Sequence, residues 1–315
     1  MARQRALISI LAGVVIATGC RADRQVTASI LDDWGRPVVL AAPARRIVSL
    51  APATTELVFA LGLGGRLVGR TTWCAYPAEA RAVADVGNGI GPNVEAVAAQ
   101  RPDLVLLYAS EANRAALERF EALGMSVAVI RLDLAADLRR AARLIGRLAG
   151  DSAAAEVLIA SFDSALSAAS QAAVPAHRLT ARIYVDIEGN PPLTLGSGSY
   201  VTEIIRAAGA ENVFADLPQP SAVVSLEAIV AREPDFVLAI SSDTLRRRAS
   251  IAGRPGWRSL RAVREGRIVV VPGDLYGQPS PRMPLAVRDL RERIAALWTG
   301  GSGAPRRRGA AAQRG

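Results

Sequence analysis

The stretch Asn93-Val-Glu-Ala-Val-Ala-Ala-Gln-Arg-Pro-Asp-Leu-Val-Leu106 returns 132 positions later as Ser225-Leu-Glu-Ala-Ile-Val-Ala-Arg-Glu-Pro-Asp-Phe-Val-Leu238, and seven of the fourteen positions are identical. Each copy predicts a short helix that leads into a buried strand. Asn93 and Ser225 are favourable N-caps, proline ends the helix, and the final apolar run is typical of a parallel strand covered on both faces. Because solenoid repeats are much shorter than this spacing, the repeat predicts two similar lobes.

Both copies carry a glutamate two residues after the cap, Glu95 and Glu227. A carboxylate in the first turn complements the positive end of the helix dipole, and this explanation suffices for either glutamate alone. It does not explain why twin lobes would present the same anion at the same place. Matched exposed anions, one on each lobe, are suited to a two-fold partner with two cationic pockets. We therefore interpret the pair as a docking surface.

Length and composition also favour two domains. A chain of 315 residues, of which 50% are apolar, can bury two cores. The formal charge of +9 resembles the signal of a nucleic-acid-binding protein, but it lies mostly at the two ends of the chain. Residues 46–299 hold 28 Arg against 26 acidic residues, and the chain has no Lys. A nucleic-acid partner is therefore not expected.

The first twenty residues are predicted to be a lipoprotein-type signal peptide. Arg3 and Arg5 precede a short apolar stretch that cannot span a bilayer as a mature helix. Small residues before Cys20 resemble a bacterial lipoprotein cleavage site, so Cys20 is expected to carry the lipid, and plain secretory cleavage stays open as an alternative. Residues 21–44 form a tether and a short first element. For Cys74, a free buried thiol is favoured over a disulfide with Cys20.

From residue 45 a strand–helix rhythm predicts a first α/β lobe over residues 45–134. Residues 135–177 show no strand pattern and predict connecting helices, the longer of which, residues 152–173, is about 33 Å long. A second lobe follows over residues 178–298, and residues 299–315 form a disordered Arg-rich tail. The predicted fold class is α/β, with two Rossmann-like lobes and parallel central sheets. One long backbone helix joins the lobes, and a ligand cleft lies between them.

The common catalytic patterns are missing from the sequence. His177 is the one histidine, at a helix exit where a solvated surface role is expected. No Gly-x-Ser-x-Gly elbow supports a catalytic triad on it, and a metal site built from several histidines is ruled out. The Gly196-Ser-Gly198 turn lacks the third glycine of a dinucleotide loop, because Val201 stands there. We expect no catalytic residue, no metal site and no cofactor.

Aromatic and apolar side chains instead follow the carboxyl ends of the predicted strands, where open α/β sheets bind their ligands. The first lobe contributes Trp73, Tyr76 and Tyr108. The second contributes the turn 188–192, Tyr200 and the loop 274–278. Trp73 and Tyr276 lie in loops rich in Gly, Pro and polar residues, so we expect both to face a ligand, whereas packing roles also suit Tyr76 and Tyr200.

At this point the chain resembles a known family over about residues 30–298. The motifs that carry the resemblance are Arg46-Ile-Val-Ser-Leu-Ala-Pro-Ala-Thr-Thr-Glu56, Cys74-Ala-Tyr-Pro77, both Glu-to-Pro-Asp segments, Gly196-Ser-Gly-Ser-Tyr200, Ala208-Gly-Ala-Glu-Asn-Val213 and Ser280-Pro-Arg282. They are similar to those of the helical-backbone (class III) substrate-binding proteins of ABC transporters, most closely the periplasmic cobalamin-binding proteins.

The resemblance implies roles for individual residues. Glu95 and Glu227 would sit on arginine pockets of the membrane permease. The loops and the resemblance together indicate ten ligand-binding residues. They are Trp73, Tyr76, Tyr108, Ile187, Asp274, Leu275, Tyr276, Gly277, Gln278 and Arg282. Gly89 and Ser221 stand where the best-known cobalamin binder has tryptophans, so the aromatic cage is thinner in this chain.

The sequence therefore predicts an exported transport protein, either periplasmic or held by its lipid on the outer face of the membrane. It would bind a corrinoid such as cobalamin as a monomer and deliver it to a permease dimer and its ATPase. Haem and an iron–siderophore are the alternative ligands, because the shared motifs serve the fold and docking. An exported enzyme on a twin α/β scaffold is the alternative of another class, but no base and nucleophile stand out.

Overall fold

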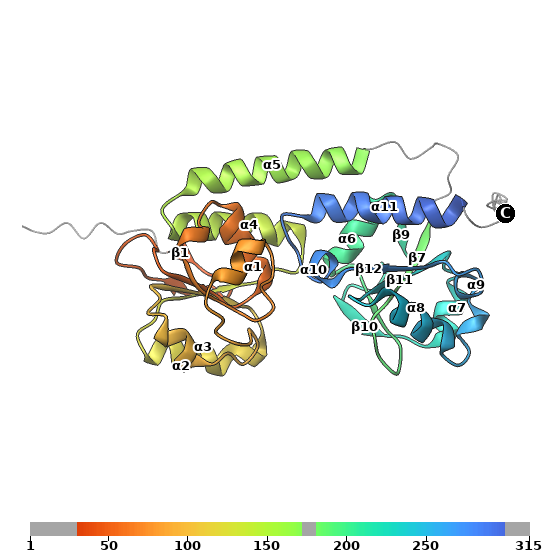
Figure 1. Cartoon of the computed structure of the whole chain (residues 1–315), viewed down its shortest axis with the longest axis horizontal. Coiled ribbons are helices and arrows are strands. Elements are labelled where there is room, and N and C mark those ends of the chain that lie inside the picture. The colour runs from red at the N-terminus through yellow and green to blue at the C-terminus, as the bar shows by residue number, and fades with distance from the viewer. Residues whose placement is uncertain (1–29, 172–180, 300–315) are drawn as a thin grey trace, which may run out of the picture.

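The computed structural model describes residues 30–171 and 181–299, and it consists of two α/β lobes side by side beneath a long helix, α5 (Figure 1). The signal peptide with Cys20, His177 and the Arg-rich tail lie outside the described residues. None of the helices in the described ranges is long and apolar enough to cross a membrane. The predicted fold class, two parallel α/β lobes joined by a long helix, is confirmed.

The N-terminal lobe is built on a four-stranded parallel sheet in the order β4-β3-β5-β6. Its strands are β3 (Ile47–Ser49), β4 (Leu67–Arg70), β5 (Leu104–Tyr108) and β6 (Val127–Ile130). Its helices are α1 (Pro52–Ala60), η1 (Gly64–Arg66), η2 (Ala78–Ala82), α2 (Val94–Ala99), η3 (Glu111–Asn113) and α3 (Arg114–Ala122). A hairpin of β1 (Ile30–Leu31) and β2 (Pro37–Val38) precedes the sheet, and the Asp33 carboxylate accepts from the Arg131 backbone at 2.7 Å.

The C-terminal lobe repeats this plan with the parallel order β12-β11-β7-β9. Its strands are β7 (Arg182–Asp186), β9 (Glu211–Asn212), β11 (Phe236–Ile240) and β12 (Ile268–Val271), with β8 (Leu193–Leu195) and β10 (Ser221–Val223) as a separate antiparallel pair. Its helices are α6 (Tyr200–Ala207), α7 (Leu226–Ala231), α8 (Thr244–Gly253), η4 (Trp257–Ser259), α9 (Arg261–Arg264), α10 (Gly273–Tyr276) and α11 (Met283–Thr299). Residues 274–276, predicted as part of a loop, thus belong to the short helix α10.

The repeated segments form the predicted helix–strand units, α2–β5 and α7–β11. The Asn93 side chain accepts from the Ala96 N–H at 3.0 Å, and the Ser225 hydroxyl accepts from the Ala228 N–H at 3.1 Å. Both N-cap predictions are confirmed. At the other end of each helix the residue before proline adopts the left-handed region, with φ of 47° at Arg101 and 44° at Glu233. The chain therefore leaves both helices by the same turn.

The aspartate of each Pro-Asp pair joins neighbouring strands. Asp103 accepts from the Arg46 N–H at 3.0 Å, next to β3, and Asp235 accepts from the Arg182 N–H at 3.1 Å, at the start of β7. Each carboxylate satisfies a backbone donor where a parallel ladder begins, so it fixes the register of two strands. This shared task explains why the pair recurs in both lobes.

Two helices connect the lobes. α4 (Ala135–Leu148) packs on α5 (Ser152–Gln171), and α5 in turn packs on α11 of the C-terminal lobe. Gly150, with φ of 73°, makes the turn between α4 and α5. Because α5 contacts helices that belong to both lobes, it ties the two together along one side of the molecule (Figure 1).

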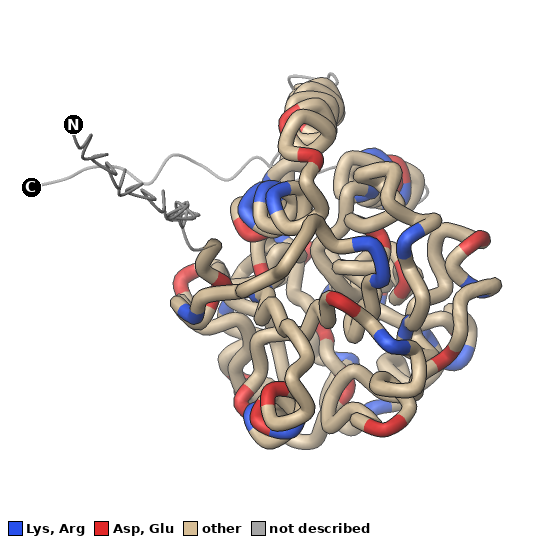
Figure 2. Tube along the Cα trace, turned by 90° about the vertical axis from the view of Figure 1, so that its left-hand side faces the viewer, with Lys and Arg blue, Asp and Glu red and all other residues tan. Residues whose placement is uncertain are grey.

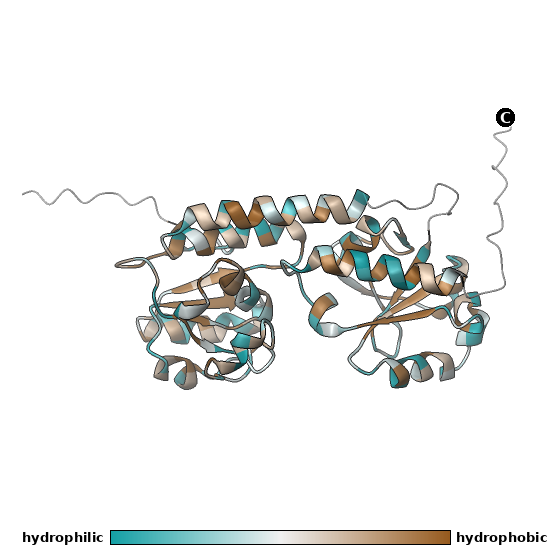
Figure 3. Ribbon diagram, turned by 45° about the horizontal axis from the view of Figure 1, so that its top comes forward, coloured by the Kyte–Doolittle hydropathy of each residue, from teal (hydrophilic) through white to brown (hydrophobic). Residues whose placement is uncertain are grey.

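The buried apolar residues form three clusters, and their distribution explains how the lobes join. One cluster runs continuously from α1 and α4 through α5 to α6 and α11, so it belongs to both lobes. The other two lie on the opposite faces of the two sheets and stay separate, around Phe120 in one lobe and Tyr184 in the other. Figure 3 shows the strands as the most apolar part of each lobe. The lobes are thus fused beneath α5 and parted on the opposite side.

Charged residues are spread over the surface. Figure 2 shows acidic and basic positions interspersed along the chain on the face in view. Many of them pair, as Arg143 does with Glu156 and Arg232 does with Asp216.

Candidate ligand pocket between the lobes

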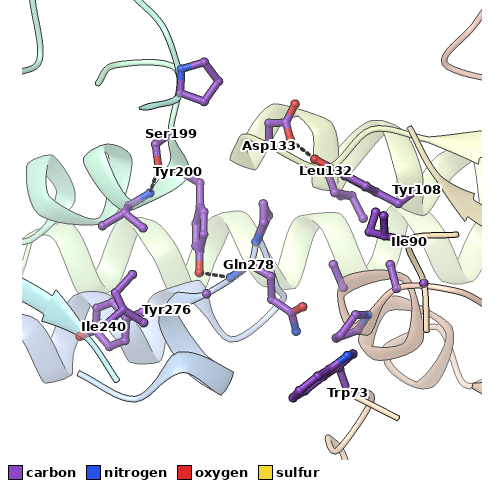
Figure 4. A pocket seen from close by; sticks show the side chains of 18 of the residues that line it. Trp73, Ile90, Tyr108, Leu132, Asp133, Ser199, Tyr200, Ile240, Tyr276 and Gln278 are labelled. Carbon is purple, nitrogen blue, oxygen red and sulfur yellow. Dashed lines mark hydrogen bonds between the residues drawn. The ribbon is translucent and has the colours of Figure 1, made fainter. Parts of the chain in front are cut away.

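A cavity of about 740 Å³ lies between the lobes, a volume typical of small-molecule sites (Figure 4). Most of its wall is apolar. The apolar and aromatic side chains are Leu50, Trp73, Ile90, Tyr108 and Leu132 from the N-terminal lobe and Ile187, Leu195, Tyr200, Ile240 and Tyr276 from the C-terminal lobe. Both lobes therefore contribute half of an apolar chamber.

The parallel sheets explain why these side chains meet. Leu50 follows β3, Tyr108 ends β5 and Leu132 comes shortly after β6, while Ile187 follows β7 and Ile240 ends β11. The carboxyl ends of parallel strands lie at one edge of a sheet, where open α/β folds bind ligands. The two edges face each other across the cavity.

Two helices also begin at the cavity. Ala51, Pro52 and Ala53 at the start of α1 line it, and no side chain caps that helix. Ser199 and Tyr200 at the start of α6 line the other side. A helix N-terminus carries about half a positive charge and free N–H donors, so the uncapped start of α1 can donate to a ligand oxygen, whereas the first N–H groups of α6 are already bonded to Asp133 and Ser199.

One charged group faces the cavity from the described residues that line it, the Asp133 carboxylate. Its Oδ1 accepts from the Tyr108 hydroxyl at 2.9 Å. Burial, together with the negative charge of Asp133, raises the pKa of Tyr108 to about 12. Tyr108 is therefore a neutral hydrogen-bond donor at physiological pH.

Gln278 links the pocket to a buried ion pair behind it. Its side-chain Nε2 donates to Glu56 Oε1 at 3.1 Å, and its backbone N–H donates to the Tyr200 hydroxyl at 2.7 Å. Glu56 lies on α1 in the N-terminal lobe and also accepts from Arg282 Nη2 at 2.6 Å. These bonds hold the loop before α11 against the first lobe.

Comparison with known proteins identifies the family. Residues 47–275, well over half of the chain, match the model of the periplasmic binding proteins. The chain belongs to this family.

Three similar proteins illustrate its relations. An uncharacterized ABC transporter substrate-binding lipoprotein of Bacillus subtilis, YvrC, is 30% identical over 272 residues, which make up 84% of this chain and 85% of that protein. The vitamin B12-binding protein of Salmonella typhimurium is 31% identical over 261 residues, 78% of this chain and 89% of that protein. The structure of the periplasmic heme-binding protein BhuT with two hemes matches 81% of this chain and 99% of its own, with a TM-score of 0.71 at 27% identity.

This periplasmic binding protein is thus the substrate-binding part of an ABC transporter and not an enzyme, and it is an exported protein. The predicted family is confirmed. Membership also implies a membrane permease as partner.

The structure brings six of the ten predicted ligand residues to the pocket wall. They are Trp73, Tyr108, Ile187, Tyr276, Gly277 and Gln278. Trp73 is 71% exposed, so its ring offers a free apolar surface at the rim. Tyr276 is fully buried in the wall, and its hydroxyl points away from the cavity, 2.7 Å from the Ala286 carbonyl oxygen and 2.9 Å from the Asp289 carboxylate.

The other four predicted residues, Tyr76, Asp274, Leu275 and Arg282, do not line the pocket. Arg282 is held by Glu56, and its guanidinium lies 3.8 Å from the centre of the Tyr76 ring. Asp274 lies on the exposed side of Arg282, with 3.6 Å between the charged groups. Leu275 packs against the core shared by the two lobes. A packed ion pair thus occupies the place where polar ligand contacts were expected.

Sequence reasoning missed several lining residues, above all Asp133, Asn88 and the start of α1. A usable signal existed for Asp133, because it comes directly after a predicted strand, as Tyr108 does. The α1 residues lie within the quoted motif 46–56, one of the motifs that the sequence assigns to the fold and docking. Gly89 also lines the pocket, and a Cβ at this position would lie 2.0 Å from the Leu50 carbonyl oxygen, so a side chain would clash there.

Glu95 and Glu227 lie far from the pocket, in the first turns of α2 and α7. Figure 1 shows both helices on the side of their lobe that faces away from α5. The Glu95 side chain is 73% exposed and pairs with Arg119 at 2.6 Å. Glu227 is also exposed, and hydrogen bonds from its own backbone N–H and from Ser225 lower the pKa of its carboxyl.

Cys74 carries a free thiol that is fully buried. The hydroxyls of Thr55 and Thr71 each lie 3.1 Å from its sulfur. Since Thr71 lines the pocket, the thiol supports the wall from behind.

Proposed function

We propose that this periplasmic binding protein captures a corrinoid, cobalamin or a close relative, in the pocket between its lobes. The main support for the proposal is the near absence of charged side chains among the described residues of the pocket wall. Among the described residues that line the pocket there is no Arg, Lys or His, and Asp133 is the one charged side chain. An apolar chamber with a single carboxylate suits a large ligand whose polar groups are uncharged donors and acceptors.

Charge argues against the anionic alternatives. Haem has two propionates, and catecholate or carboxylate siderophores are also anions. Removing such groups from water is costly unless a cation meets them. A corrinoid instead carries carboxamides around its ring. Their N–H groups can donate to Asp133, and their carbonyl oxygens can accept from the helix N-terminus of α1.

The pocket tyrosines argue in the same direction. Tyrosine ligates iron as a phenolate. Burial raises the pKa of Tyr108 to about 12 and also raises the pKa of Tyr200 and Tyr276. The hydroxyls of all three lining tyrosines are also hydrogen-bonded within the protein, to Asp133, Gln278 and Asp289, so none presents a free phenol oxygen to an iron.

The relatives support both a corrinoid and a second candidate. The Salmonella typhimurium protein is named for vitamin B12, which favours the corrinoid. BhuT was solved with two hemes and shares the fold at 27% identity, so haem is the second candidate.

We propose further that Glu95 and Glu227 dock the protein onto the permease of the transporter, which carries the ATPase. Their matched places, exposure and common face support this role. The exposed Glu95–Arg119 pair is a weak obstacle, because such pairs contribute at most about 1 kcal/mol. A lipid on Cys20 would hold the protein at the outer face of the membrane, as the lipoprotein name of the Bacillus subtilis relative suggests.

Calorimetric titration of the purified chain tests the ligand. We expect cyanocobalamin or dicyanocobinamide to bind with a Kd in the micromolar range or below, and haemin to bind at least tenfold more weakly. Tight binding of haemin with no heat from either corrinoid would overturn the proposal in favour of haem.

A further inference from the structure

Asp133 occupies a fixed position where the two lobes touch. Its backbone N–H donates to Asp137 Oδ2 at 3.0 Å, at the start of α4. Its carbonyl accepts from the Tyr200 N–H of the other lobe at 3.1 Å. Next to it, the Ala135 N–H donates to Glu203 Oε2 at 2.8 Å on α6. Because both sides of its backbone are held, Asp133 has little freedom to turn away from the ligand space.

The side chain is engaged on one oxygen only. Oδ1 accepts from the Tyr108 hydroxyl, and Figure 4 shows this pair at the pocket wall. Oδ2 has no hydrogen-bond or ion-pair partner among residues 30–171 and 181–299. The nearby cation Arg140 is already taken by Asp33 and Asp137. One oxygen of an anchored carboxylate is therefore free, on a residue that lines the cavity.

The remaining polar groups of the wall are mostly occupied within the protein. Tyr200 is bonded to Gln278, and the Gln278 amide nitrogen is bonded to Glu56. The Thr71 hydroxyl lies against Cys74. Among the described lining residues, Asp133 thus offers the strongest free hydrogen-bond acceptor to a ligand.

We infer that Asp133, anchored by Tyr108, accepts a carboxamide N–H of the ligand and selects amide-bearing corrinoids over carboxylate-bearing analogues of the same ring. The inference rests on the proposed function. An N–H donor gains a charge-assisted hydrogen bond with the carboxylate. A ligand carboxylate at the same place meets a like charge, and no Arg, Lys or His among the described lining residues is there to offset it.

The test compares two corrinoids that differ in these groups, dicyanocobinamide with its amides and dicyanocobyrinic acid with free carboxylates. The proteins are the wild type, Asp133→Asn and, as a matched control, Asp163→Asn on the surface of α5, where Asp163 pairs with Arg139. Kd is measured for both ligands by calorimetry at low ionic strength. The ratio of the two values for one protein does not depend on the fraction that is folded.

We expect the wild type and Asp163→Asn to prefer the amide ligand by at least tenfold. Asp133→Asn should bind dicyanocobinamide about 10- to 100-fold more weakly, the worth of one hydrogen bond to a charged group, and should lose most of the preference. An unchanged ratio in Asp133→Asn, with the wild type binding dicyanocobinamide, would overturn the role of Asp133 alone. A wild type that binds neither corrinoid would overturn the proposed function and this inference together.

Discussion

Glu56 Oε1 of the N-terminal lobe lies 2.6 Å from Arg282 Nη2 of the C-terminal lobe, although 226 positions separate the two residues in the chain. The pair is buried, with side-chain exposures of 3% for Glu56 and 12% for Arg282. Glu56 Oε2 accepts in addition from the Ser280 hydroxyl at 2.6 Å. Together with α5 and the shared apolar cluster, this ion pair sets how far apart the two halves of the pocket stand.

Breaking this pair should destabilise the whole protein. Glu56→Ala leaves the Arg282 guanidinium buried without its partner, which typically costs about 3–5 kcal/mol. We expect the free energy of unfolding, measured in urea, to fall by that amount. The double variant Glu56→Ala with Arg282→Ala should lose less stability than the sum of the two single losses. Glu111→Ala, which removes the exposed pair with Arg114, is the control and should change stability by less than about 1 kcal/mol. A Glu56→Ala protein as stable as the control would contradict the account.

Removing the two proposed docking carboxylates should abolish transport and leave ligand binding intact. In Glu95→Ala with Glu227→Ala, we expect Kd for the corrinoid within twofold of the wild type, because both residues lie away from the pocket. Permease-dependent uptake should be lost, since each charge-assisted contact contributes a few kcal/mol to such a complex. Glu118→Ala, an exposed neighbour on α3, serves as control. Normal uptake by the double variant would show that the glutamates only complement helix dipoles.

Trp73 should provide a platform for the ligand ring. Its indole is exposed to water and becomes buried when a macrocycle covers it. Burying an apolar side chain of this kind contributes about 1.5–3 kcal/mol to the free energy of binding. We expect Trp73→Ala to weaken corrinoid binding by about tenfold or more and Trp73→Phe to keep most of the affinity. Val157→Ala, which trims an exposed apolar side chain on α5, should have no effect. Equal affinity in Trp73→Ala and the wild type would place the ring elsewhere.

Stability should fall in alkali as Tyr108 ionises. Burial and the Asp133 charge raise the pKa of Tyr108 from its ordinary value of 10.0 to about 12, so the folded state favours the neutral phenol. The stabilising contribution is complete below pH 10 and is lost as the pH rises through 12. Absorbance at 295 nm is titrated against pH for the wild type and for Tyr108→Phe. The variant should lack the wild type's ionisation step near pH 12 and should keep every step near pH 10. A lost step near pH 10 would mean that the hydroxyl is neither buried nor next to the Asp133 charge.

Local patterns predicted the fold well. The repeat around Pro102 and Pro234 predicted the twin lobes, and the cap residues Asn93 and Ser225 predicted where two helices begin, because these features depend on neighbours in the sequence. Strand ends also located the pocket through Trp73 and Tyr108, and the family resemblance pointed to Ile187.

Contacts between distant segments were out of reach. Glu56 and Arg282 both stood in quoted motifs, yet nothing local says that they meet across the lobes. Arg282 therefore seemed free to bind a ligand, whereas Glu56 holds it. Asp133 was overlooked for the converse reason, because an acidic residue before a helix has an ordinary explanation until the structure shows it facing a cavity.

A competition between the two candidate ligands tests the central claim most directly. The purified protein is mixed with equimolar cyanocobalamin and haemin, freed of unbound ligand by gel filtration, and its visible spectrum is recorded. Because Asp133 is the one charged side chain among the described lining residues, we expect the corrinoid to be retained. The spectrum should show the corrinoid bands near 360 and 550 nm, at about one ligand per chain, and no Soret band. A strong Soret band near 400 nm without corrinoid bands would contradict it.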